Sequence, residues 1–78
     1  NTLIVRNMDR PGCITEVSAA LSREKINVAT MQVFRHKRGG LAVMVVETDQ
    51  FIPENVVAEL KMKEDILEVI SLNLEEGR

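Results

Sequence analysis

One short stretch decides how this chain folds: residues 7–12 read Asn7-Met8-Asp9-Arg10-Pro11-Gly12. It follows an apolar run, Leu3-Ile4-Val5, and precedes apolar residues at helical spacing, Ile14, Val17 and Leu21. Proline fits the first turn of a helix, and glycine, which has no Cβ, leaves neighbouring backbone amides accessible. The stretch is therefore predicted to lead from a strand into a helix and to present the positive end of that helix to an anion.

Outward from this turn, the spacing of apolar residues predicts four strands and two helices. The first strand, residues 2–6, contains the continuous apolar run Leu3-Ile4-Val5, which indicates burial on both faces. The first helix, residues 11–24, has an apolar face made of Ile14, Val17, Ala20 and Leu21. The remaining elements are strands over residues 26–36, 41–48 and 66–74, and a helix that starts near Pro53.

This order of elements predicts an α+β fold of the ferredoxin-like βαββαβ type. Right-handed crossovers place two helices on one face of a four-stranded antiparallel sheet, in the order 4-1-3-2. Gly39-Gly40 suits the turn of the central hairpin, and residues 75–78 are expected to be a frayed tail. The second strand, with Met31 and Val33, lies at an edge, where an apolar strand invites pairing with another chain. We therefore expect a homodimer joined through this edge.

The turn and one residue after the first helix form the candidate binding site. The candidate ligand-binding residues are Asn7, Met8, Asp9, Arg10, Pro11, Gly12 and Asn27. In the predicted fold Asn27 and the turn lie at opposite ends of the first helix, so one copy could not bring both to a small ligand. Two copies related by a two-fold axis could, which predicts a ligand at a dimer interface. The alternative is a plain connector, with Asp9 or Arg10 capping the helix.

Composition argues against several other functions. The single cysteine, Cys13, and the single histidine, His36, form neither a catalytic triad nor a metal-binding set, and Cys13 is expected to be a small packing group. The net charge is −2, and the basic run from Arg35 to Arg38 is typical of a solvated hairpin tip. An RNA-binding module of this fold stacks bases on aromatic residues of its central strands, and the first and third strands carry none. We predict no catalysis, no cofactor or metal, and no nucleic-acid partner.

The length of 78 residues fits one domain, and the first residue, Asn1, suggests a segment of a longer chain. No apolar run approaches the roughly 20 residues of a membrane span. We expect a cytoplasmic location and no membrane partner.

Three groups of residues resemble the ACT domain, a ligand-binding regulatory module attached mostly to enzymes of amino-acid metabolism. They are Asp9-Arg10-Pro11-Gly12, Ile26-Asn27-Val28 with Ala29 and Met31, and Gly39-Gly40 before Leu41-Ala42-Val43-Met44-Val45. The resemblance covers nearly the whole chain, so residues 1–78 are expected to be a single ACT-like domain. It implies a non-catalytic module that binds an amino acid at a homodimer interface and regulates a parent catalytic domain or subunit.

In serine-binding ACT domains the turn supplies a histidine and an asparagine, and the second strand begins with an asparagine. Asn7, Asp9 and Asn27 hold those places here, and Asp9 is the departure, since its carboxylate would repel a ligand carboxylate. Residues 1–5 and 47–50 look most like the C-terminal ACT segment of bacterial iron–sulfur L-serine dehydratase, beta chain. That resemblance implies L-serine as the ligand and a 4Fe-4S cluster elsewhere in the parent. Two alternatives are the ACT domain of D-3-phosphoglycerate dehydrogenase, with feedback inhibition by serine, and a purely structural dimerisation domain.

Overall fold

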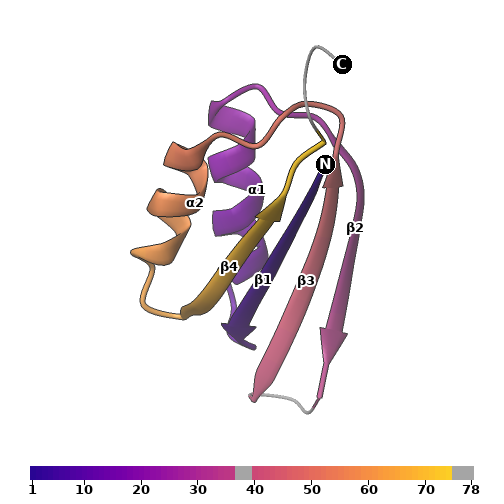
Figure 1. The fold of residues 1–78 in the computed structure, drawn as a ribbon. Coiled ribbons are helices and arrows are strands. Elements are labelled where there is room, and N and C mark those ends of the chain that lie inside the picture. Colours follow the sequence, from indigo (N-terminus) through magenta and orange to yellow (C-terminus); the bar gives the residue numbers. More distant parts are fainter. Residues whose placement is uncertain (37–39, 75–78) are drawn as a thin grey trace.

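The computed structural model of the chain describes residues 1–36 and 40–74. Its elements are β1 (Thr2–Met8), α1 (Cys13–Arg23), β2 (Val28–Arg35), β3 (Leu41–Thr48), α2 (Glu54–Lys61) and β4 (Ile66–Leu72) (Figure 1). This is the predicted succession of strand, helix, strand, strand, helix and strand.

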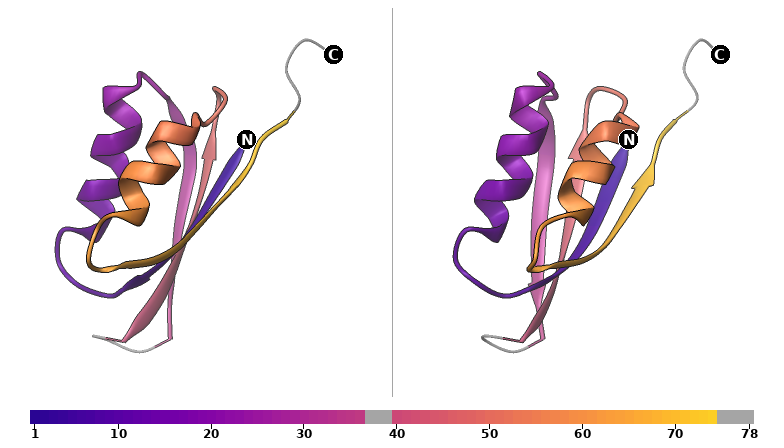
Figure 2. Two further views of the ribbon diagram at one scale, coloured as in Figure 1. Left: turned by 60° about the vertical axis from the view of Figure 1, so that its left-hand side comes forward. Right: turned by 90° about the vertical axis from the view of Figure 1, so that its left-hand side faces the viewer.

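The four strands form one antiparallel sheet in the order β2-β3-β1-β4. This is the predicted order read from the opposite edge, and it leaves β2 and β4 at the edges. Both helices lie on one side of the sheet (Figure 2). The ferredoxin-like α+β fold predicted from the sequence is therefore confirmed.

The core lies between this side of the sheet and the two helices. Along β1 the buried residues alternate, with Leu3, Val5 and Asn7 inside, whereas Ile4 is half-buried and Arg6 is exposed. The prediction that β1 is buried on both faces is wrong, because the helices cover only one face of the sheet. The largest fully buried side chains are Leu3, Leu21, Met44, Ile52 and Leu60.

Helix α1 begins at Cys13 and not at residue 11, because Gly12 has φ +94°, far from helical values. Cys13 is buried with Val17, Ala20 and Leu21, as expected for a packing group, but Ile14 is 48% exposed. Ile14 is thus not a core residue and is available to a surface site.

The side-chain amides of Gln50 and Asn73 form hydrogen bonds with the backbone just outside the ends of strands. Asn27 donates its backbone N–H to Oε1 of Gln50 at 2.7 Å, ahead of the β2–β3 ladder, which begins at Val28. Past the end of β4, Asn73 accepts from the Ile52 N–H at 2.9 Å and donates to its carbonyl at 3.0 Å. The predicted hairpin position Gly39 and the predicted tail, residues 75–78, lie outside the described residues.

Candidate functional site

A pocket of about 640 Å³ lies where the β1–α1 turn meets the end of β2. Its lining residues come from the turn, the first turn of α1 and the helix-facing side of β2: Asp9, Arg10, Pro11, Gly12, Ile14, Val33 and Arg35. The volume falls within the roughly 300–1,000 Å³ typical of small-molecule sites. The wall combines apolar groups, Ile14 and Val33, with charged groups, Asp9 and Arg35.

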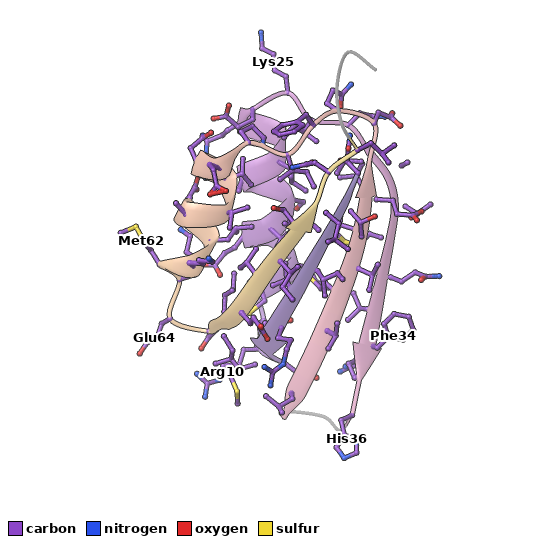
Figure 3. All side chains as sticks on the ribbon, in the orientation of Figure 1. Arg10, Lys25, Phe34, His36, Met62 and Glu64 are labelled. Atoms are coloured by element: carbon purple, nitrogen blue, oxygen red, sulfur yellow. The ribbon has the colours of Figure 1, made fainter. Side chains whose placement is uncertain are left out.

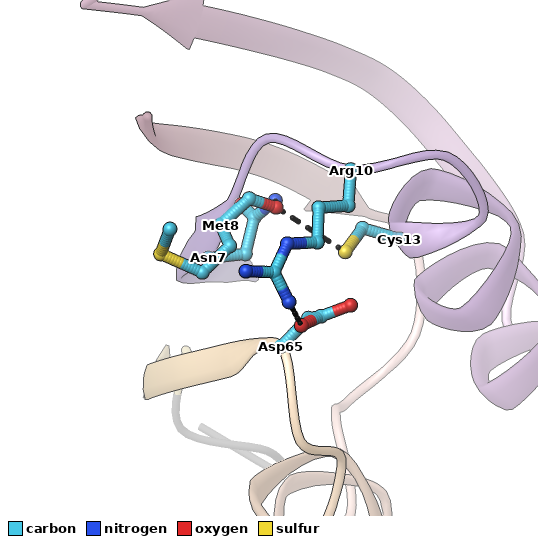
Figure 4. A network of polar contacts seen from close by, with 5 residues as sticks. All are labelled: Asn7, Met8, Arg10, Cys13 and Asp65. Carbon is cyan, nitrogen blue, oxygen red and sulfur yellow. Dashed lines mark hydrogen bonds and ion pairs between the residues drawn. The ribbon is translucent and has the colours of Figure 1, made fainter. Parts of the chain in front are cut away.

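One carbonyl holds the turn beside this pocket. The Met8 carbonyl accepts from the Arg10 backbone N–H at 2.9 Å and from Nδ2 of Asn7 at 2.8 Å. It also accepts a weaker contact from Sγ of Cys13 at 3.4 Å (Figure 4). The shape of the turn is therefore set by groups on both of its sides, from the end of β1 to the first residue of α1.

The turn is also tied to the loop before β4. The Met8 N–H donates to the Asp65 carbonyl at 2.8 Å, and the Arg10 guanidinium lies 2.7 Å from a carboxylate oxygen of Asp65 (Figure 4). Arg10 is thus engaged with Asp65, although it also lines the pocket.

No side chain caps the start of α1 within the described part of the chain, and Gly12 occupies the N-cap position. The predicted alternative, a cap from Asp9 or Arg10, is wrong because both side chains are used elsewhere. Arg10 contacts Asp65, and Oδ2 of Asp9 accepts from Nε of Arg35 at 2.9 Å. A helix N-terminus without a side-chain cap keeps unpaired amides and a partial positive charge, both of which suit an anion.

The pair of Asp9 and Arg35 was not expected from the sequence. The Arg35 side chain is 52% exposed and the Asp9 side chain 21% exposed. The sequence pattern places Arg35 in the basic hairpin, whose residues 37 and 38 lie outside the described residues. The position of Arg35 along β2 could have revealed this pair, because alternate residues of a strand point to the same face. Met31, Val33 and Arg35 share the face towards the helices, and of these three Arg35 lies at the end of β2 that is next to the β1–α1 turn.

The structure brings four of the seven candidate residues, Asp9 to Gly12, to the pocket. Asn7 and Met8 do not line it. Asn7 is only 3% exposed and faces the helices, and its Oδ1 atom is buried with no hydrogen-bond partner among the described residues. Met8 contributes the carbonyl that shapes the turn.

Asn27 lies at the other end of α1. Arg10 and Lys25, which flank the helix, mark these opposite ends in Figure 3. Asn27 donates Nδ2 to Oδ2 of Asp49 at 2.7 Å, and its carbonyl accepts from the Asp49 N–H at 3.0 Å. The expectation that one copy keeps Asn27 away from the turn is confirmed by this arrangement.

Among the described residues, no group of three or more His, Cys, Asp or Glu side chains could hold a metal ion. None of the helices in residues 1–36 and 40–74 is long and apolar enough to cross a membrane.

Comparisons with known proteins place these features in a family. The chain is 39% identical over 71 residues to D-3-phosphoglycerate dehydrogenase of Methanocaldococcus jannaschii, a match that covers 91% of this chain and 14% of that protein. It is 37% identical over 70 residues to a probable L-serine dehydratase, beta chain, of Bacillus subtilis, covering 90% of this chain and 31% of that one. The chain thus spans less than a third of the length of either relative.

A solved structure shares the fold of this chain. The crystal structure of the ACT domain of prephenate dehydrogenase from Bacillus anthracis superimposes with a TM-score of 0.56 at 24% identity, over 80% of this chain and 86% of that one. The family model for the ACT domain matches residues 1–61. With that match and the βαββαβ topology together, the chain belongs to the ACT-domain family.

Proposed function

We propose that this domain is a regulatory amino-acid sensor that binds L-serine between two copies of the chain and performs no chemistry itself. The observation that carries the proposal is the pocket beside the uncapped start of α1 and the free edge of β2. The similarity to a probable L-serine dehydratase supports serine as the ligand, since that name states a serine substrate.

The start of α1 is the place for the ligand carboxylate. Backbone N–H groups in the first turn of a helix and the helix dipole both favour an anion. Pro11 and Gly12 add no bulky side chain over these groups, and both line the pocket. A bound carboxylate would supply the cap that no side chain of the described structure provides.

The free edge of β2 is the place for the second copy. The His36 N–H donates to the Leu41 carbonyl at 3.2 Å, so by alternation the backbone groups of Phe34 and Gln32 point to β3. Those of Arg35, Val33 and Met31 then point outward, where a second strand could pair with them.

A two-fold axis between the Met31 residues of two copies, near the middle of β2, would pair the two strands antiparallel. Arg35, at the end of one β2, would then lie near the start of the partner's β2, which Asn27 precedes. Arg35 lines the pocket, so this pairing would bring the partner's Asn27 towards the site. That arrangement supports a ligand held by the turn of one copy and Asn27 of the other.

Regulation would follow from the shared site. A ligand can shift a protein between two states only by binding one of them more tightly, and a site completed by two copies exists only when they are paired. Since the chain covers a small part of its relatives, the regulated catalysis and any 4Fe-4S cluster would lie in another part of the parent enzyme. An L-serine dehydratase is the parent we favour, and D-3-phosphoglycerate dehydrogenase is the alternative.

Calorimetry with L-serine, together with light scattering, tests both halves of the proposal. The variant Met31→Pro removes an outward N–H at the centre of the edge, and Met31→Ala is its control because it removes the side chain and keeps the N–H. We expect dimers and serine binding for the original chain and for Met31→Ala, and monomers without binding for Met31→Pro. Serine binding by a monomer, or binding unchanged by Asn27→Ala, would contradict the shared site.

A purely structural dimerisation domain is the second candidate. It is favoured by Asn7 and Asn27, whose side chains already have hydrogen-bond partners within one copy. This function predicts dimers in light scattering and no thermal shift with any amino acid.

A further inference from the structure

Asp9 and Arg35 place opposite charges side by side on the wall of the pocket. Nε of Arg35 donates to Oδ2 of Asp9 at 2.9 Å, and both residues line the pocket together with the apolar Ile14 and Val33. The turn supplies the negative group and the end of β2 supplies the positive one. The pocket therefore offers an acceptor and a donor of full charge at neighbouring points.

This pair contributes little to folding. The Arg35 side chain is 52% exposed, and ion pairs in such surroundings are screened by water. The loss of this contact should therefore leave the domain folded.

Both partners retain binding capacity. A guanidinium carries five N–H donors, and among the described residues Arg35 uses only Nε, so its terminal nitrogens can bind a planar carboxylate. An ionised carboxylate has about four lone-pair sites on its two oxygens, more than the single contact with Arg35 occupies.

We propose that Asp9 and Arg35 recognise a zwitterion: Arg35 donates to the carboxylate of an α-amino acid, and Asp9 accepts from its ammonium group. This inference rests on the proposed amino-acid function and specifies the ligand class. The carboxylate lies between the Arg35 guanidinium and the start of α1, and the ammonium group lies over Asp9. The repulsion expected between Asp9 and a ligand carboxylate is offset because Arg35 neutralises Asp9.

The rest of the wall specifies the ligand side chain. Ile14 is 48% exposed and Val33 37% exposed, so an apolar surface lies next to the charged pair. Arg10, the other cation of the wall, is paired with Asp65 at 2.7 Å. The pocket thus suits an amino acid with an uncharged side chain better than one with a second charge.

The experiment measures affinity by calorimetry on the full 78-residue chain, first with L-serine and then with each of the other common L-amino acids. The tightest-binding amino acid is then titrated into Arg35→Gln, Asp9→Asn and Arg35→Lys. Its α-amide, which lacks the carboxylate charge, is titrated into the original chain and into Arg35→Gln. The control is Arg6→Gln, because the pair Arg6–Glu68 has the same 2.9 Å separation and Arg6 is about as exposed as Arg35, at 49% against 52%, but lies outside the pocket.

We expect Arg35→Gln and Asp9→Asn each to weaken binding roughly 10- to 100-fold, as for the loss of one charge-assisted hydrogen bond. Arg35→Lys should restore part of the affinity, and Arg6→Gln should leave it unchanged. The α-amide should bind the original chain and Arg35→Gln equally weakly, a result that a merely structural role of Arg35 would not produce.

Two results would overturn the inference, and they differ in what they say of the proposed function. If an amino acid binds and the Arg35 and Asp9 variants bind it as tightly as the original chain, zwitterion recognition is wrong and amino-acid sensing stands. If no amino acid binds the original chain, both are wrong.

Discussion

The substitution Gly12→Ala tests whether the geometry of the turn is set by its backbone. Gly12 is the N-cap residue of α1 and has φ +94° and ψ −16°. A Cβ atom built there meets nothing within 4 Å, so no contact with neighbouring atoms would be strained. Any loss of stability would have to come from the residue's own backbone conformation.

That origin sets the size of the effect. A left-handed conformation costs a residue with a Cβ about 1–2 kcal/mol, and alanine regains roughly 0.4–1 kcal/mol by restricting the unfolded chain. The net loss is about 1 kcal/mol, which for a domain of this size lowers Tm by roughly 4–8 °C. Thermal melting followed by circular dichroism measures it.

Gly12→Asn is the matched comparison, because asparagine adopts positive φ more readily than alanine although its side chain is larger. We expect the order of stability glycine, asparagine, alanine. If alanine left Tm unchanged, or if asparagine were the more damaging of the two, the backbone explanation would be refuted.

The other predictions concern the core, the buried amide and one ion pair, all measured by urea denaturation. Leu60→Ala should lower the free energy of unfolding by about 2–5 kcal/mol because Leu60 is fully buried. Met62→Ala is the control, since Met62 is 86% exposed and its loss should change the free energy of unfolding by less than about 0.5 kcal/mol. Equal losses in the two variants would contradict the described core. Asn7→Ala should cost about 1–2 kcal/mol, since it removes the hydrogen bond to the Met8 carbonyl and leaves a small cavity, and an unchanged midpoint would show that the turn does not need this bond. Arg23→Gln removes the ion pair to Glu59, whose side chains are 57% and 35% exposed, and should cost less than about 1 kcal/mol, with the difference vanishing in high salt.

The sheet and its strand order could be predicted because local signals agree with one another. Pro11-Gly12 marks a helix start, and the apolar spacing after it and after Pro53 is helical. A βαβ unit repeated twice leaves few topologies once crossovers must be right-handed. The exposure of Ile14 could not be predicted from apolar spacing, which groups it with Val17 and Leu21. The buried face of α1 also includes Cys13 and Ala20, and Ile14 lies at the margin of that face.

The site was harder to predict than the fold. Asp9 to Gly12 are neighbours in sequence and were found as a motif, whereas Arg35 reaches Asp9 across 26 residues. That contact depends on how far β2 extends and on which face its last residue points. Asn7 looks like a ligand donor in sequence, but the alternation of β1 turns it towards the helices. Whether a side chain near a turn lines a pocket is thus decided by strand parity, which has a period of two and changes with a shift of one residue.

The contact between Cys13 and the Met8 carbonyl gives the turn a built-in chemical reporter. Cys13 is the single cysteine of the sequence and is 3% exposed, so a thiol-alkylating reagent reaches it only when the start of α1 separates from the end of β1. The alkylation rate, compared with that of the unfolded chain, therefore measures the free energy of local opening beside the pocket. Any molecule that binds at the turn and reduces its opening slows the alkylation of Cys13. The alkylation rate can therefore be used to screen compounds without attaching a dye or a tag.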